Sequence, residues 1–149
     1  MKRNTFRFAA ILSLALMLTA SIVFANPEMR IKATIPFEFS VGSQTLPAGQ
    51  YIVRPLNNNG MLMIQSADDH HRTALINTSS VQALPGQERA RLVFRKYGDQ
   101  YFLGQVWPGG DAVGYQSARS GRERALLQAP NKNLAQRSVS PESVTVAAQ

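Results

Sequence analysis

The sequence predicts an all-β fold, either an antiparallel β-sandwich or a small closed β-barrel. Two observations predict it. Residues 30–41 alternate strictly between apolar and polar side chains, which is typical of a strand with one buried face. Turn-forming Gly, Pro, Asn and Asp separate about seven short stretches rich in β-branched or aromatic residues. The chain has no cysteine, so packing alone must stabilise the fold.

The stretch 30–41 is the clearest predicted strand. Arg30 and every second residue after it point to one face, and the apolar residues point to the other: Ile31, Ala33, Ile35, Phe37, Phe39 and Val41. Pro36 interrupts the polar face and has no N–H to donate to a neighbouring strand. We therefore expect this strand to lie at a sheet edge, or to be bent or bulged at Pro36.

Further strands are expected over residues 50–56, 61–65, 72–77, 90–97, 100–107 and 112–117. The best hairpin joins 90–97 to 100–107 through the turn Gly98-Asp99. Ser120 and Glu123 have the spacing of a helix capping box, so the next stretch forms either one or two helical turns or a last strand. Residues 130–149 show no periodicity, and we expect a disordered tail there.

The N-terminus has the three parts of a secretory signal. Lys2, Arg3 and Arg7 precede an apolar stretch over residues 8–23, and small residues then lead to a cleavage site after Ala25. An uncleaved membrane anchor is the alternative, but the apolar stretch is somewhat short for one. We expect a leader at 1–25, an all-β domain at 26–129, and a periplasmic or extracellular protein that meets the membrane only during export.

The charge pattern argues against a nucleic-acid partner. The formal charge is +7, and loss of Lys2, Arg3 and Arg7 with the predicted leader lowers it to +4. The remaining cations are scattered along strands between apolar residues, as on a solvated surface. The missing cysteine also excludes a lipid-modified N-terminus.

Three segments carry a resemblance to a known family. They cover residues 35–42 (IPFEFSVG), 46–51 (LPAGQY) and 92–103 (LVFRKYGDQYFL). With the residues between them, from about 31 to 127, the chain resembles a family of small exported proteins of acidobacterial-type soil bacteria. The resemblance implies an exported β domain. It implies no catalytic residues, because none are established for that family.

One cluster has the residue types of a metal site. It consists of Asp68, Asp69, His70 and His71. Adjacent histidines on a strand point to opposite faces, so both reach one ion only if the loop curls. A polar hairpin loop is the favoured interpretation, and the sequence predicts no metal or other cofactor.

Catalytic groups are scattered. No serine lies in a nucleophile elbow, and no glycine-rich loop has the lysine of a phosphate site. The carboxylates that could pair for glycoside hydrolysis are Glu38, Glu88, Asp99, Asp111 and Glu123. Nothing in the sequence shows that any two of them converge, so the sequence favours a protein that is not an enzyme.

Aromatic residues gather around the central hairpin and are the best candidates for a ligand-binding surface: Tyr97, Tyr101, Trp107 and Tyr115. Exposed on one face they could stack on sugar rings or anchor a protein, and turned inward they belong to the core. The function that the sequence favours is a non-catalytic binding or interaction module for envelope polysaccharide, lipid or another protein. A small polysaccharide hydrolase is one alternative, and a structural protein that self-associates through an edge strand is another.

Overall fold

Ten β-strands and one α-helix form the described part of the chain. The computed structural model describes residues 29–57, 59–83, 89–110, 112–128 and 141–149, so the predicted leader at 1–25 lies outside it. The elements are β1 (Ile31–Ile35), β2 (Phe39–Val41), β3 (Gln44–Leu46), β4 (Gly49–Pro55), β5 (Met61–Ser66), β6 (Thr73–Gln82), β7 (Arg91–Tyr97), β8 (Gln100–Trp107), β9 (Val113–Ser117), α2 (Gly121–Gln128) and β10 (Glu142–Ala147).

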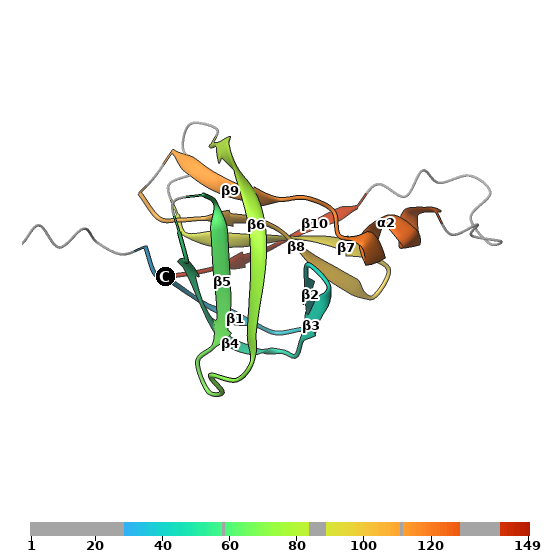
Figure 1. The fold of residues 1–149 in the computed structure, drawn as a ribbon, viewed down its shortest axis with the longest axis horizontal. Coiled ribbons are helices and arrows are strands. Elements are labelled where there is room, and N and C mark those ends of the chain that lie inside the picture. The colour runs from blue at the N-terminus through green and yellow to red at the C-terminus, as the bar shows by residue number, and fades with distance from the viewer. Residues whose placement is uncertain (1–28, 58, 84–88, 111, 129–140) are drawn as a thin grey trace, which may run out of the picture.

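The strands belong to one large sheet that folds over into two layers. One layer has the order β1-β4-β5-β6, and the other contains β10, β7 and β8. The long strand β6 connects them, because its first half pairs with β5 and its second half with β9. In Figure 1, β5 and β6 cross β7 and β8 steeply. The all-β prediction is confirmed, the sheet is not closed into a barrel, and the two layers are compatible with a sandwich.

Pro36 divides the predicted strand 30–41 in two. The ladder with β4 ends at Ile35, and β2 begins at Phe39, where it pairs with β3 and β8 in the other layer. The predicted alternation is correct in β1, where exposed and buried residues alternate along the strand. The predicted effect of Pro36 is also correct, since the strand lies at an edge of the ladder and ends at the residue before the proline.

The core lies between the two layers and is rich in aromatic rings. Phe39 contacts Tyr51 and Phe94 edge-on, with ring centroids 5.0 and 5.4 Å apart. These edge-to-face pairs add stability beyond their buried area. The largest side chains with almost no exposed surface include Tyr51, Phe39, Phe94, Phe102, Ile35, Leu62, Ile64 and Leu92.

The predicted hairpin is confirmed, with one irregularity in the pairing of its strands. Strands β7 and β8 pair along their length, and Gly98 takes the left-handed conformation (φ 59°) at the turn between them. The register shifts between Val93 and Phe94, which face Gln105 and Leu103, so Gly104 is the extra residue of a β-bulge.

The prediction of a disordered tail is wrong for residues 141–149. Strand β10 pairs antiparallel with β7 over its whole length, from Glu142 opposite Lys96 to Ala147 opposite Arg91. Its residues Val144 and Val146 pack against the core. Residues 129–140 of the predicted tail lie outside the described part.

The stretch after β9 forms a helix rather than a last strand. Ser120 precedes α2, and its hydroxyl oxygen accepts a hydrogen bond from the Glu123 amide at 3.1 Å. This bond satisfies one of the free N–H groups at the start of the helix. Within the residues that the structure describes, no helix has the length and apolar character needed to cross a membrane.

Candidate functional site

A groove of about 430 Å³ lies where the two ends of the ladder meet. Lys32 and Gln149 exchange two backbone hydrogen bonds of 2.7 and 2.9 Å, and an isolated bridge pairs Ala33 with Ala148. We call this contact between β1 and the chain after β10 the seam. The volume of the groove lies within the range usual for ligand-binding clefts.

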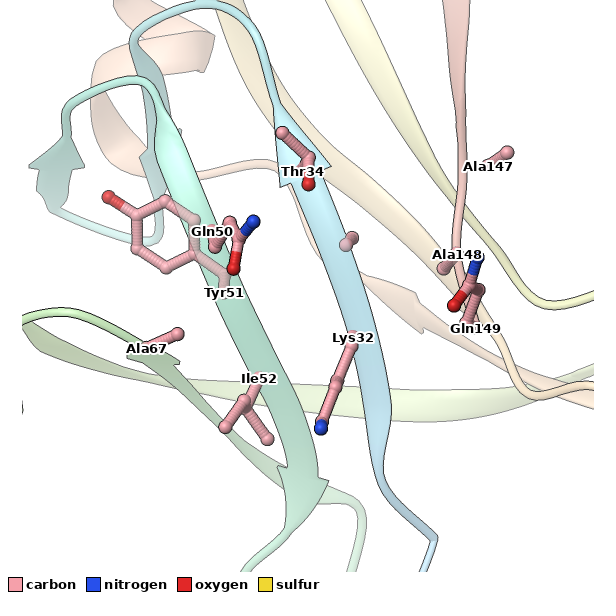
Figure 2. Close-up of a pocket in the computed structure, with 10 residues that line it drawn as sticks. Lys32, Thr34, Gln50, Tyr51, Ile52, Ala67, Ala147, Ala148 and Gln149 are labelled. Atoms are coloured by element: carbon pink, nitrogen blue, oxygen red, sulfur yellow. The ribbon is translucent and has the colours of Figure 1, made fainter.

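The groove has a polar lining with one positive charge. Figure 2 shows β4 and β1 side by side, with residues 147–149 beyond β1. The exposed lining side chains are the Lys32 ammonium, the Thr34 hydroxyl and the amides of Gln50 and Gln149. No Asp or Glu side chain belongs to the described lining. The strand pattern explains the arrangement, because the residues between these, such as Ala33 and Tyr51, point into the core.

A second cluster of chemically active groups lies under α2 and is buried. The side chain of Glu123 is 1% exposed, and that of Arg95 is 15% exposed. The Glu123 carboxylate and the Arg95 guanidinium form a bidentate ion pair. The Arg95 Nε–Glu123 Oε1 distance is 2.6 Å, and the Nη2–Oε2 distance is 3.0 Å. The helix thus buries its acidic residue and fastens it to β7.

Tyr97 and Ser117 form further hydrogen bonds with this pair. The Tyr97 hydroxyl donates to Glu123 Oε1 at 2.9 Å, and Arg95 also donates to the Ser117 carbonyl and hydroxyl oxygens, each at 3.3 Å. Burial, and then the hydrogen bond to Glu123, raise the pKa of the Tyr97 hydroxyl. Among the described residues, no buried side-chain polar atom lacks a partner. The cluster therefore fastens the helix to the sheet and holds no group free for acid–base work.

The bulge in β8 makes room for this ion pair. A Cβ placed on Gly104 would lie 3.1 Å from Arg95 Nη1 and 3.2 Å from the Val93 carbonyl oxygen. A glycine here lets the Arg95 side chain pass over the strand toward Glu123.

The four aromatic candidates do not share one exposed face. Tyr97 and Trp107 are 8% and 4% exposed, so their rings are closed to stacking by a ligand. Tyr101 is half-buried and stacks on Phe37, with centroids 3.9 Å apart, and Tyr115 is half-buried against the core. Ligand binding stays a prediction for Tyr101 and Tyr115.

Trp107 is held on both sides. The guanidinium of Arg91 lies over its ring, 4.9 Å from the centroid. On the other side a Cβ at Gly114 would come within 2.7 Å of the ring atom Cδ2. The indole N–H donates to Gln105 Oε1 at 3.1 Å. These contacts explain why the tryptophan is a structural residue of the β8–β9 pair.

The loop Asp68–His71 is a turn built on Asp69. Its carboxylate accepts the His71 amide at 3.0 Å and pairs with Arg72 at 3.2 Å. Within the described ranges, no three side chains of the kinds that bind metals come together. The loop matches the polar hairpin connection that the sequence favoured.

The described carboxylates that could pair for hydrolysis lie in different parts of the structure. Glu123 is buried in the ion pair, whereas Glu38 and Asp99 are exposed on separate loops. Glu88 and Asp111 lie outside the described residues. The groove at the seam, which no single sequence motif marks, is the site that sequence reasoning missed.

Comparisons of this chain with protein-family models, with curated proteins and with solved structures found no match. The groove and the surfaces around it are therefore the features from which a function is inferred.

Proposed function

We propose that this protein is an exported, non-catalytic binding module of the cell envelope, and that it binds a segment of an envelope polysaccharide in the groove at the seam. The observation that carries the proposal is the lining of the groove, which offers a hydroxyl, two amides and an ammonium. Such groups donate and accept hydrogen bonds with the hydroxyls of a sugar, and Lys32 favours an acidic sugar.

The surroundings of the ionisable groups support binding rather than hydrolysis. A glycoside hydrolase needs two carboxyl groups facing the same cleft, within about 10 Å of each other. The described lining of the groove contains no Asp or Glu side chain, and the buried carboxylate of Glu123 is bound to Arg95 and Tyr97.

Export to the periplasm or beyond follows from the predicted leader. The resemblance to exported β-domain proteins supports the same location. Mass spectrometry of the protein recovered from the exported fraction tests this, with the expected mature chain beginning at Asn26. Recovery of the intact leader in a membrane fraction would instead support the uncleaved anchor.

A thermal-shift screen tests the binding activity. The protein purified after export is heated with acidic and neutral polysaccharide fragments. A fragment present at about 100 times its dissociation constant adds about 2.7 kcal/mol to the stability of the folded state, so the melting temperature rises. We expect the largest shift with acidic fragments, because Lys32 is the charge in the groove.

Two groove variants and one control locate the site. Gln50→Ala and Lys32→Gln are expected to reduce the shift, because both side chains line the groove. Gln82→Ala is the control, since Gln82 is also an exposed strand glutamine but lies on β6 away from the groove. Equal binding in all three variants contradicts the groove as the site, and release of new reducing ends from a fragment supports the hydrolase.

A further inference from the structure

The outward face of β4, β5 and β6 carries a regular arrangement of apolar residues. The strand register sets nine neighbouring positions in three rows: Ile52, Gln65 and Thr73; Arg54, Met63 and Leu75; and Leu56, Met61 and Asn77. We call these nine positions the outer lattice. Strand spacing and rise give it a size of about 10 Å by about 14 Å.

Five of the nine positions are apolar, although the face points away from the core. Leu75 is 51% exposed and Leu56 is 49% exposed, whereas the inward-facing neighbours Leu62 and Ile64 are fully buried. Two methionines lie between Leu56 and Leu75 in the register. Met61 is half-buried and can adapt its shape to a partner, whereas Met63 is only 9% exposed and is one of the buried residues. Helix α2 lies beside β7 and does not cover this face (Figure 1).

The acidic residues nearest to the outer lattice in the chain, Asp68 and Asp69, lie in the adjoining β5–β6 turn, where Asp69 pairs with Arg72, and the charge on the outer lattice is positive. Arg54 lies within it, and Lys32 stands next to Ile52 on the neighbouring strand β1. No acidic residue occupies any of the nine positions. An apolar area with cations in and beside it is complementary to a bilayer that contains anionic lipids, where the apolar side chains enter between headgroups and the cations meet phosphates.

We propose that the outer lattice binds the protein reversibly to the surface of an anionic lipid bilayer. The inference goes beyond the proposed function, since it assigns a lipid-binding surface that adjoins the groove, shares Ile52 with its lining and would hold the groove close to a membrane. It departs from the expectation that the chain meets the membrane only during export.

A second copy of the chain fits this surface less well than a bilayer does. A stable dimer buries roughly 800 Å² on each partner, several times the area of the outer lattice. Two copies face to face would also bring Arg54 and Lys32 of one copy toward the same cations of the other. A bilayer needs no such area, because single leucines insert individually.

Co-sedimentation with vesicles tests the proposal. The exported protein is mixed with vesicles of phosphatidylcholine alone and with vesicles that also contain phosphatidylglycerol. We expect binding to the anionic vesicles, weaker at high salt because the charge attraction is screened. Leu75→Ser is expected to weaken the partition about tenfold, and Arg54→Gln about fivefold.

Matched controls keep the outcome clear. Val113 is 44% exposed on β9, and Arg124 is exposed on α2, so Val113→Ser and Arg124→Gln change an exposed aliphatic residue and an exposed arginine outside the outer lattice. These variants should bind like the unchanged protein. Loss of helix or sheet signal in circular dichroism identifies a variant that fails to fold, and Leu75→Asn then replaces Leu75→Ser.

Three results would overturn the proposal. They are no binding to anionic vesicles, equal binding of Leu75→Ser and the unchanged protein, and a concentration-dependent dimer in sedimentation that Leu75→Ser abolishes. The vesicle assay contains no polysaccharide, and Gln50 lies outside the outer lattice. Failure of membrane binding therefore does not contradict the polymer-binding proposal, and failure of polymer binding does not contradict membrane binding.

Discussion

At the scale of single residues, the buried ion pair between Arg95 and Glu123 joins the helix to the sheet. Glu123 accepts hydrogen bonds from both Arg95 and Tyr97, and Arg95 reaches across the bulge at Gly104 to do so. Burying two charges is costly by itself, and the cost is offset when each charge keeps a well-placed partner. The pair therefore specifies where the helix sits, and its stabilising effect depends on both members being present.

Removal of one partner should be strongly destabilising. Glu123→Ala leaves the Arg95 guanidinium almost buried without its counterion, and we expect a loss of about 3–5 kcal/mol in the free energy of unfolding. The unfolding midpoint in urea measures it. Glu142→Ala removes a carboxylate from an exposed pair with Lys96 and is expected to leave the midpoint unchanged.

The double variant Arg95→Met with Glu123→Leu separates two explanations. If the loss in Glu123→Ala comes from an uncompensated charge, replacing both charges by apolar groups should recover most of it. A double variant as unstable as Glu123→Ala would show instead that the shape and hydrogen bonds of the cluster are indispensable.

The buried hydroxyl of Tyr97 makes stability sensitive to alkali. Its pKa is raised by burial and by the hydrogen bond to Glu123, so above about pH 10 the unfolded chain loses this proton while the folded chain keeps it. The free energy of unfolding therefore falls as the pH rises from about 10 toward the pKa of Tyr97 in the folded protein. Below that range the titration of Tyr97 does not change the free energy of unfolding.

Tyr97→Phe should flatten this alkaline fall. Unfolding in urea is followed between about pH 8 and 11, and the slopes of stability against pH are compared. The variant also loses a hydrogen bond at every pH, which lowers the curve without tilting it. An unchanged slope would contradict the assigned role of Tyr97. Burial also raises the pKa of the Tyr51 hydroxyl. We therefore expect Tyr51 to add a further fall in stability over the same alkaline range.

At the scale of elements, β10 protects an edge of the sheet. It covers the outer side of β7, and Val144 and Val146 extend the core. Exposed edge strands are templates for pairing with other chains. A chain ending at residue 140 should be less stable and should associate through β7.

Urea unfolding and sedimentation velocity measure these two effects. Val144→Ala with Val146→Ala serves as the comparison, because it keeps the β7–β10 backbone pairing and removes only apolar contacts. This variant should lose stability yet stay monomeric. A truncated chain that remains monomeric and equally stable would contradict the structural role of β10.

The sequence was sufficient for most strands but not for how they pair. Alternation and turn residues predicted the hairpin and β1 because those signals are local. The signal for β10 was present, since Val144 and Val146 alternate with Ser143 and Thr145. It was missed because the stretch is short, lies among polar residues and pairs with a strand far away in sequence.

The first turn of helix α2 also has a long-range contact that the sequence pattern did not predict. Ser120 accepts the amide of Glu123 as the capping-box spacing predicts, but the Glu123 carboxylate binds Arg95. The partner lies 28 residues earlier, and sequence alone did not place the two together.

At the scale of the whole molecule, the candidate site is a product of topology. The groove combines residues of β1 and β4 with residues 147–149, which meet because the two ends of the ladder approach each other at the seam. None of these segments carries a motif of its own. Two of the aromatic residues that the sequence offered as ligand-binding candidates, Tyr97 and Trp107, are buried, since β7 and β8 lie between other strands.

One isolated bridge and two backbone hydrogen bonds join the two ends of the ladder at the seam. Ala33 and Ala148 lie opposite each other there, next to the two backbone hydrogen bonds that join Lys32 and Gln149. Directly opposed positions of this kind suit a disulfide, and the chain contains no other cysteine to compete. Ala33→Cys with Ala148→Cys should therefore crosslink on oxidation and close a loop of more than 100 residues.

The crosslink should raise the free energy of unfolding by about 4–5 kcal/mol, because it restricts the unfolded chain. The same sample after reduction is its own control, and the difference in urea midpoint between the two forms measures the effect. Since both alanines line the groove, comparing fragment binding in the two forms also asks whether ligands enter by opening the seam. Slower binding in the oxidised form indicates that they do, whereas failure of the cysteines to crosslink would contradict the closed seam itself.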